Sequence, residues 1–212
     1  MDTNQRPFDV ILFDLGGVLV ELTGSARLLE WANHIQSIEE LWQLWLTSPS
    51  VRLFETGRCT PEQFATTLIT EMGLEVSAEQ FLIEFTGWPT QPYPGSRELL
   101  QMLTPHYRLG CLANTNVLHW KRISEEMGLL DLFHLPLASH LIGVLKPDHA
   151  AFLYAAEKLQ AAPQQILFLD DNLLNVQAAQ AIGMAAHRVQ GLTETVAKLK
   201  EVGVGQDLTF AH

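Results

Sequence analysis

The chain has 212 residues, of which 47% are hydrophobic, enough for one sizeable α/β domain with an inserted module. The formal net charge of -11 argues against nucleic acid or an anionic membrane as a partner, because both require clustered Lys and Arg. Two cysteines suggest no disulfide framework, and residues 1–7 are polar and lack a signal-peptide core. We therefore expect a cytoplasmic protein, a monomer or homodimer, that binds neither nucleic acid nor membrane.

The first predicted element is a strand over residues 10–13, a short apolar run that ends at Asp14 and is followed by Gly16 and Gly17. A carboxylate at the carboxyl end of a parallel strand lies where open α/β sheets bind ligands, and glycines allow a ligand to approach the backbone. Taken alone, Asp14 is equally consistent with the start of an ordinary turn.

The next segment, residues 22–92, predicts a small bundle of helices. Capping-box spacing marks three helix starts, at Ser37 to Glu40, Thr60 to Gln63 and Ser77 to Gln80. Its charged residues are interpreted as a solvated face; the alternative is that Arg52, Glu55 and Arg58 line its inner face.

Three later apolar runs predict further strands, each with polar residues beyond its end. The strands are 109–113, 135–138 and 166–169, and the polar residues that follow them are Asn114, Thr115 and Asn116, then Lys146, then Asp170 and Asp171. Helical patterns separate the runs, so right-handed crossovers would make the strands parallel and gather these ends at one edge. We expect Asp14, Asn114, Lys146 and Asp171 to share one crevice.

The residue types in this crevice suit phosphate chemistry. Two or three carboxylates favour a hard cation such as Mg²⁺, which typically binds one or two carboxylates and a substrate phosphate. Lys146 would supply a compensating charge, and Asp14 is able to act as a nucleophile, because carboxylates form aspartyl-phosphates. The competing interpretation is that Asp170 and Asp171 only cap the following helix.

The motifs also resemble a known family. The segments 13–19, 114–116, 146–147 and 170–175 look like the four ordered motifs of the haloacid dehalogenase superfamily, and the match spans nearly the whole chain. Within it, the chain is most similar to the small-phosphatase subgroup that includes α-glucose-1-phosphate phosphatase. The resemblance implies a doubly wound, Rossmann-like parallel sheet over residues 1–21 and 93–212, with residues 22–92 as a helical-bundle cap.

The resemblance also implies roles for individual residues. Asp14 would be the nucleophile, and Lys146 would hold Asp14 and the phosphate. Mg²⁺ would be bound by Asp14, Asp171 with Asp170 beside it, and the backbone carbonyl of Gly16. The substrate and its phosphate would be contacted by Gly16, Gly17, Asn114, Thr115, Asn116 and His119.

Two positions depart from the family pattern. Gly16 stands where phosphatases of the superfamily usually carry an Asp as general acid and base, a function typically worth about 10²- to 10⁴-fold in rate. The reaction would therefore be slower, use another donor such as His119 or Glu21, or act on esters with good leaving groups. Ala113 stands where Ser or Thr normally binds a phosphate oxygen, and Thr115 is a candidate replacement.

The sequence thus predicts a Mg²⁺-dependent phosphatase that acts on a small phosphorylated metabolite through an aspartyl-phosphate on Asp14. One alternative is a 2-haloacid dehalogenase, which would use the same nucleophile on carbon without a metal. The other is a protein that has lost turnover, because Gly16 and Ala113 weaken the site, and that binds a phosphorylated ligand or a partner.

Overall fold

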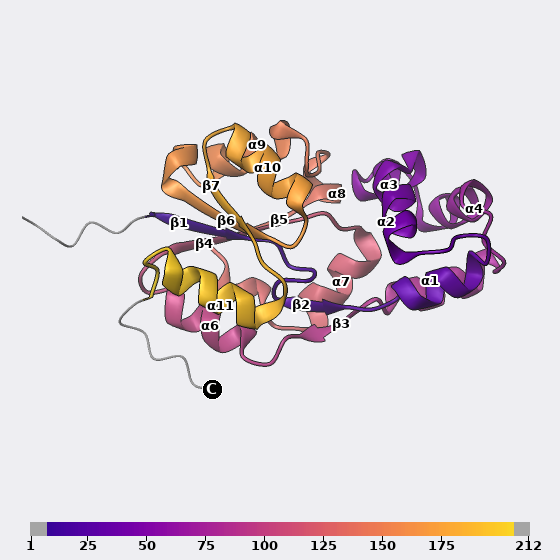
Figure 1. Cartoon of the computed structure of the whole chain (residues 1–212), viewed down its shortest axis with the longest axis horizontal. Coiled ribbons are helices and arrows are strands. Elements are labelled where there is room, and N and C mark those ends of the chain that lie inside the picture. Colours follow the sequence, from indigo (N-terminus) through magenta and orange to yellow (C-terminus); the bar gives the residue numbers. More distant parts are fainter. Residues whose placement is uncertain (1–7, 206–212) are drawn as a thin grey trace, which may run out of the picture.

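The computed structural model describes residues 8–205, which form a parallel sheet flanked by helices and a separate helical lobe (Figure 1). The sheet has five strands in the order β5-β4-β1-β6-β7. They are β1 (Val10–Phe13), β4 (Arg108–Ala113), β5 (Leu135–Ala138), β6 (Ile166–Asp170) and β7 (Ala185–Arg188). All neighbouring pairs are parallel, which confirms the expected α/β fold. The sequence does not predict β7, because Ala-Ala-His-Arg contains no apolar run.

Helices cover both faces of the sheet, as Figure 1 shows. One face packs against α6 (Ser96–Leu103), α7 (Val117–Glu126) and α11 (Gly191–Glu201), the other against α9 (His149–Lys158) and α10 (Leu173–Ala181). Within β1, Ile11 and Phe13 belong to the first core and Val10 and Leu12 to the second. A strand buried on both faces needs an apolar run without polar alternation, which explains the pattern that marks these strands.

The order in which strands are added to the sheet reverses at β1: β4 and β5 lie on one side of it, and β6 and β7 on the other. The connection after β1 leads to α6 on one face, whereas the connection after β6 leads to α10 on the other. Where neighbouring strands send their connections to opposite faces, a crevice opens beyond their carboxyl ends. Asp14 follows β1, and Asp170 and Asp171 lie at the end of β6.

The helical lobe is inserted between β2 (Val20–Leu22) and β3 (Pro89–Pro92), which pair antiparallel. Its helices are α1 (Ser25–Trp31), α2 (Ile38–Thr47), α3 (Pro49–Glu55), α4 (Pro61–Glu71) and α5 (Ala78–Thr86). The predicted caps form as expected: the side chains of Ser37, Thr60 and Ser77 each accept a hydrogen bond from the backbone N–H three residues later. The lobe is called the cap below; the exact boundaries at 22 and 92 stay a prediction.

The cap has its own core, built largely from aromatic rings. Phe54 stacks on Phe64 with centroids 4.3 Å apart, and Trp45 packs against Phe85 and Trp88. Such rings bury large apolar areas, so these short helices are stabilised mainly by one another. Three smaller elements complete the described chain: α8 (Ser139–Ile142) and the 3-10 turns Leu130–Leu132 and Pro163–Gln165. Within residues 8–205, no helix has the length and hydropathy needed to cross a membrane.

Candidate active site

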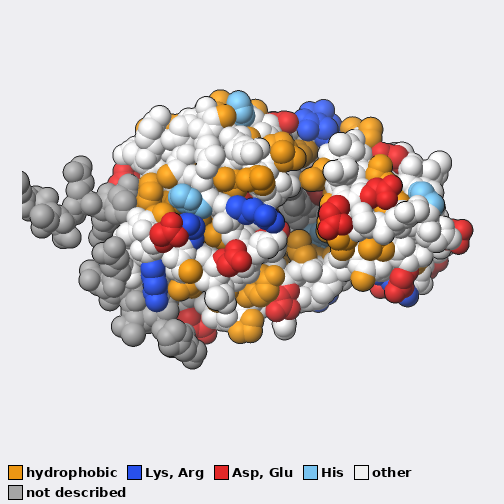
Figure 2. Space-filling view, viewed as in Figure 1, with side chains coloured by type: hydrophobic (Ala, Val, Ile, Leu, Met, Phe, Trp, Pro, Cys, Tyr) orange, Lys and Arg blue, Asp and Glu red, His pale blue; other side chains and the backbone are white. Residues whose placement is uncertain are grey.

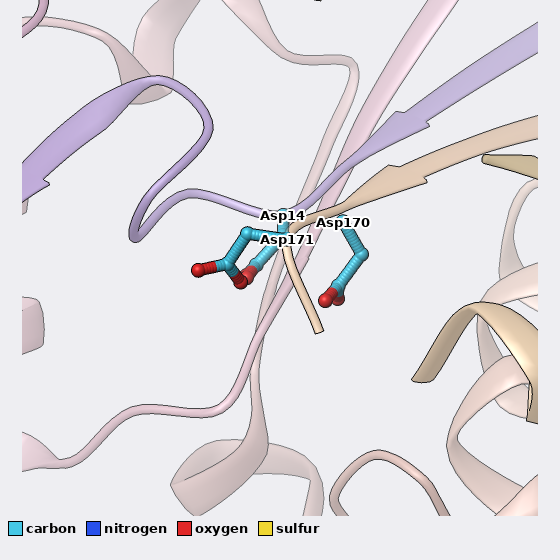
Figure 3. A group of neighbouring side chains, drawn as sticks. All are labelled: Asp14, Asp170 and Asp171. Atoms are coloured by element: carbon cyan, nitrogen blue, oxygen red, sulfur yellow. The ribbon is translucent and has the colours of Figure 1, made fainter. Parts of the chain in front are cut away.

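Three carboxylates meet at the carboxyl edge of the sheet. Asp14, Asp170 and Asp171 extend from the ends of β1 and β6 into the same space (Figure 3), and each offers an oxygen within 4.8 Å of the others. The backbone N–H of Asp14 donates to the carbonyl of Leu169 at 2.8 Å, so the sheet ladder itself sets the position of Asp14. Of the residues expected to gather at the strand ends, Asp14 and Asp171 therefore lie together, with Asp170 beside them.

Lys146 neutralises part of this charge. Its Nζ lies 2.9 Å from Oδ1 of Asp14 and 2.7 Å from Oδ2 of Asp170, and its side chain is 1% exposed. Burial lowers the pKa of Lys146, but the attraction of Asp14 and Asp170 outweighs burial and raises it. The lysine therefore stays an ammonium, held against the proposed nucleophile.

The two neighbouring aspartates of β6 have different surroundings. Asp170 is fully buried and accepts hydrogen bonds from Lys146, from the backbone N–H of Asn172 at 2.8 Å and from Nδ2 of Asn175 at 3.0 Å. Its oxygens are thus occupied in orienting the lysine. Asp171 is only partly buried, which leaves Asp14 and Asp171 as the carboxylates best placed to bind a cation.

Gly17 makes room for Asp171. Its φ is +72°, a conformation that L side chains rarely adopt, and a Cβ there would overlap the carboxylate of Asp171. Gly16 forms an isolated bridge with Val20 in the same turn. A side chain at position 17 would therefore displace one of the carboxylates of the cluster.

The electrostatics of the cluster fit a divalent cation. Burial, together with the charges of Asp170 and Asp171, raises the pKa of Asp14 to about 7 despite the attraction of Lys146. Burial and Asp170 raise the pKa of Asp171 to about 6. Three carboxylates face one ammonium, so the ionised site carries excess negative charge that protons or a cation must offset. Carboxylate oxygens at this spacing are suitable ligands for Mg²⁺.

The segment 114–116 is engaged mainly with the protein itself. Asn114 donates from Nδ2 to the carbonyl of Lys146 at 2.7 Å and accepts at Oδ1 from the N–H of Lys146 at 2.8 Å. It therefore positions the lysine, and its expected contact with phosphate stays a prediction. Asn116 caps α7 by accepting from the N–H groups of Leu118 and His119. The buried hydroxyl of Thr115 has no hydrogen-bond partner in residues 8–205, and its expected contact with the substrate or its phosphate stays a prediction.

His119 lies in the joint between cap and core. Its ring is 4.2 Å from that of Phe85, its Nε2 lies 2.7 Å from the Phe85 carbonyl and its Nδ1 lies 3.2 Å from Nδ2 of Asn116. Burial lowers its pKa to about 4. Both ring nitrogens are engaged, so the geometry gives no support to the expectation that His119 contacts substrate or donates a proton.

From the sequence, Glu55 was expected to be a solvated charge on the surface of the cap. It is the last residue of α3 and is only partly exposed. Burial raises its pKa to about 7, against the influence of Lys146 and of a hydrogen bond from Trp45. One signal in the sequence was available: an acidic residue at a helix C-terminus opposes the helix dipole and needs another explanation. Arg52 of the same helix pairs instead with Asp148 of the core.

Comparisons with known proteins agree with this geometry. A phosphatase of Mycobacterium tuberculosis, MT3486, is 28% identical over 193 residues, which cover 87% of this chain and 88% of the relative. The (S)-2-haloacid dehalogenase of Xanthobacter autotrophicus is 27% identical, with 87% of this chain and 76% of the relative covered.

Among solved structures, enzyme bt-2542 of Bacteroides thetaiotaomicron, in complex with magnesium and inorganic phosphate, superimposes with a TM-score of 0.70 and 28% identity. The superposition covers 86% of this chain and 94% of that one. Residues 8–183 match the haloacid dehalogenase-like hydrolase family. By its motifs, fold and site, the chain belongs to the haloacid dehalogenase-like hydrolases.

Proposed function

We propose that this protein is a Mg²⁺-dependent phosphatase that hydrolyses a small phosphorylated metabolite through an aspartyl-phosphate on Asp14. The observation that carries the proposal is the pairing of Asp14 with Lys146 at 2.9 Å, beside the partly exposed carboxylate of Asp171. A phosphatase relative and a similar structure with bound magnesium and phosphate support it.

The chain supplies the nucleophile and the positioning groups. The free oxygen of Asp14 attacks phosphorus, the bond to the leaving group breaks, and water then hydrolyses the aspartyl-phosphate. Lys146 favours the ionised form of Asp14, holds it in place and offers its charge to the phosphate oxygens, while Asp170 and Asn114 hold the lysine. Asp14, Asp171 and the carbonyl of Gly16 would hold Mg²⁺. Bound there, Mg²⁺ would stabilise the negative charge that develops on the phosphoryl group.

The substrate is proposed by chemical class. On the resemblance of its motifs to the subgroup that includes α-glucose-1-phosphate phosphatase, we propose a sugar phosphate or a comparable small metabolite phosphate. The net charge of -11 gives no general attraction for phosphate, so affinity has to come from the site and its cation. We further propose a cytoplasmic protein that acts as a monomer or homodimer.

Two other functions remain as competing proposals. A 2-haloacid dehalogenase would use Asp14 on carbon, and one relative is such an enzyme. It needs no cation, whereas Gly17 makes room here for the second carboxylate, Asp171. A phosphate-binding protein without turnover would retain the site but lack a proton donor at Gly16.

One assay separates the three functions. Purified protein is incubated with a panel of phosphorylated metabolites and with 2-chloropropionate, with added Mg²⁺ or with a chelator, and phosphate and chloride release are both measured. We expect phosphate release that depends on Mg²⁺ and is lost in Asp14→Asn but kept in Asp131→Asn, an exposed control. Chloride release insensitive to chelation would establish a dehalogenase, and phosphate binding without release would establish a binding protein.

A further inference from the structure

Glu55 is the last residue of α3, the cap helix that contacts α8 of the core and lies beside it in Figure 1. Shortly before it in α3, Arg52 forms an ion pair with Asp148 of the core. Just after it, Gly57 has a φ of +71° and lies so close to the carbonyl of His140 that a Cβ would overlap that oxygen. These contacts on either side hold the end of α3 against the edge of the sheet that carries the active site.

The charge of Lys146 acts on both the Glu55 carboxyl and Asp14. The ammonium of Lys146 is close enough to lower the pKa of Glu55, and the same ammonium lies 2.9 Å from Asp14. A side-chain hydrogen bond with Trp45 also lowers the pKa of the Glu55 carboxyl. Figure 2 shows hydrophobic side chains on both sides of the boundary between the two lobes, a setting in which a partly buried carboxyl readily retains a proton.

The reaction needs a proton donor, and the core does not supply one. Gly16 has no side chain, the oxygens of Asp170 are already hydrogen-bonded, and Asp171 belongs to the cation-binding set. The carboxyl groups whose pKa Lys146 lowers include those of Asp14, Asp171 and Glu55. Glu55 is the member of this group that comes from the cap, where the leaving group of a phosphate ester would extend.

We propose that Glu55 is the proton donor and acceptor of the reaction, replacing the carboxyl absent at Gly16. The proposal rests on the phosphatase function proposed above. In the first half-reaction, an oxygen of Asp14 bonds to phosphorus, the bond from phosphorus to the leaving oxygen breaks, and the Glu55 proton moves to that oxygen, releasing the alcohol. In the second, a water oxygen bonds to phosphorus, the bond to Asp14 breaks, and a water proton returns to Glu55. The sum is ester plus water giving alcohol plus phosphate.

The test is the dependence of rate on the leaving group. For Glu55→Gln and the unmodified protein, kcat and KM are measured with Mg²⁺ on 4-nitrophenyl phosphate, on aryl phosphates with less acidic leaving groups and on glycerol 2-phosphate. The ratio kcat/KM reports only the steps up to release of the leaving group. A 4-nitrophenolate departs without a proton, so kcat/KM for its ester should change little. The glycerol leaving group needs a proton, so kcat/KM for glycerol 2-phosphate should fall about 10²- to 10⁴-fold. The variant should therefore show a much steeper dependence on leaving-group pKa.

Controls separate proton transfer from packing. Glu79→Gln, at an exposed cap glutamate on α5, should keep the unmodified dependence. Glutamine at 55 can still accept from Trp45, so its thermal unfolding should match that of the unmodified protein. If it unfolds earlier, Glu55→Asp, which keeps a carboxyl, should retain the shallow dependence at reduced kcat.

The outcomes distinguish this proposal from the proposed function. If Asp14→Asn is inactive but Glu55→Gln keeps the unmodified slope, or loses the same factor in kcat/KM on every ester, Glu55 donates no proton to the leaving group, and the phosphatase function stands while this proposal falls. A change confined to KM would likewise assign Glu55 to binding and overturn the proposal. If the unmodified protein releases no phosphate from any ester, both proposals fall.

Discussion

The buried imidazole of His119 should make the protein sensitive to acid in a way that one substitution removes. Its Nδ1 faces the amide nitrogen of Asn116, whose Oδ1 is fixed by two backbone N–H groups, and its Nε2 faces the carbonyl of Phe85. This arrangement requires the neutral ring with the proton on Nε2. A second proton would be forced against the N–H of Asn116 in a buried site.

The size of the effect follows from the shift in pKa. Burial lowers the pKa of His119 from 6.5 to about 4. Between these values the unfolded chain binds a proton that the folded chain does not, so stability falls as pH falls. Each unit of pKa shift corresponds to about 1.4 kcal/mol. Between about pH 7.5 and about pH 4.5, His119 alone should therefore lower the free energy of unfolding by about 2.5 kcal/mol.

The assay is urea unfolding followed by tryptophan fluorescence at several pH values between those limits. His119→Gln keeps a donor for the Phe85 carbonyl but cannot titrate, so its free energy of unfolding should decline less over the interval, by about 2.5 kcal/mol. Contributions of other titrating groups are common to both proteins and cancel. His34→Gln, at an exposed histidine, should behave like the unmodified protein. Equal declines in His119→Gln and the unmodified protein would refute the reasoning.

Three further predictions concern the carboxylate cluster. Asp14→Asn should retain the unmodified thermal unfolding but reduce phosphate release to background, because an amide is a poor nucleophile; measurable turnover would exclude the covalent mechanism. Exhaustive chelation should stop phosphate release, and added Mg²⁺ should restore it; release that survives chelation would remove the cation from the mechanism. Gly17→Ala should cost about 1 to 2 kcal/mol of stability, measured by urea unfolding, and should weaken Mg²⁺ binding in calorimetry, because its Cβ would displace Asp171. Unchanged Mg²⁺ affinity would show that Asp171 is not a ligand.

Much of the core and part of the site were predictable from local sequence. Strands buried on both faces must be short apolar runs, and in a parallel sheet their carboxyl ends meet at one edge. Asp14, Lys146 and Asp171 therefore come together as expected. The helix starts at Ser37 and Thr60 were equally predictable, because a cap depends on residues only a few positions apart.

The partners of buried side chains were not predictable in the same way. Asn114 and His119 follow the expected strand, but hydrogen bonds to Lys146 and to Phe85, which are distant in sequence, decide what their side chains do. Glu55 looked like a solvated charge, because nothing near it in sequence shows that the end of α3 rests against the core. The sequence does not predict β7, because its residues form no apolar run. The strand is fixed by its pairing with β6 and its packing against α10, which are contacts between segments.

Elements with a local cause could be derived from the residues alone: apolar runs, helix caps, the glycines of the first turn and the order of the polar strand ends. Packing between distant segments sets which carboxylate is saturated and which is available, encloses the neutral ring of His119, and brings a cap glutamate close enough to Lys146 to feel its charge. The physical reason is that burial and Coulomb interactions depend on distances between segments, and the packing of cap on core sets those distances.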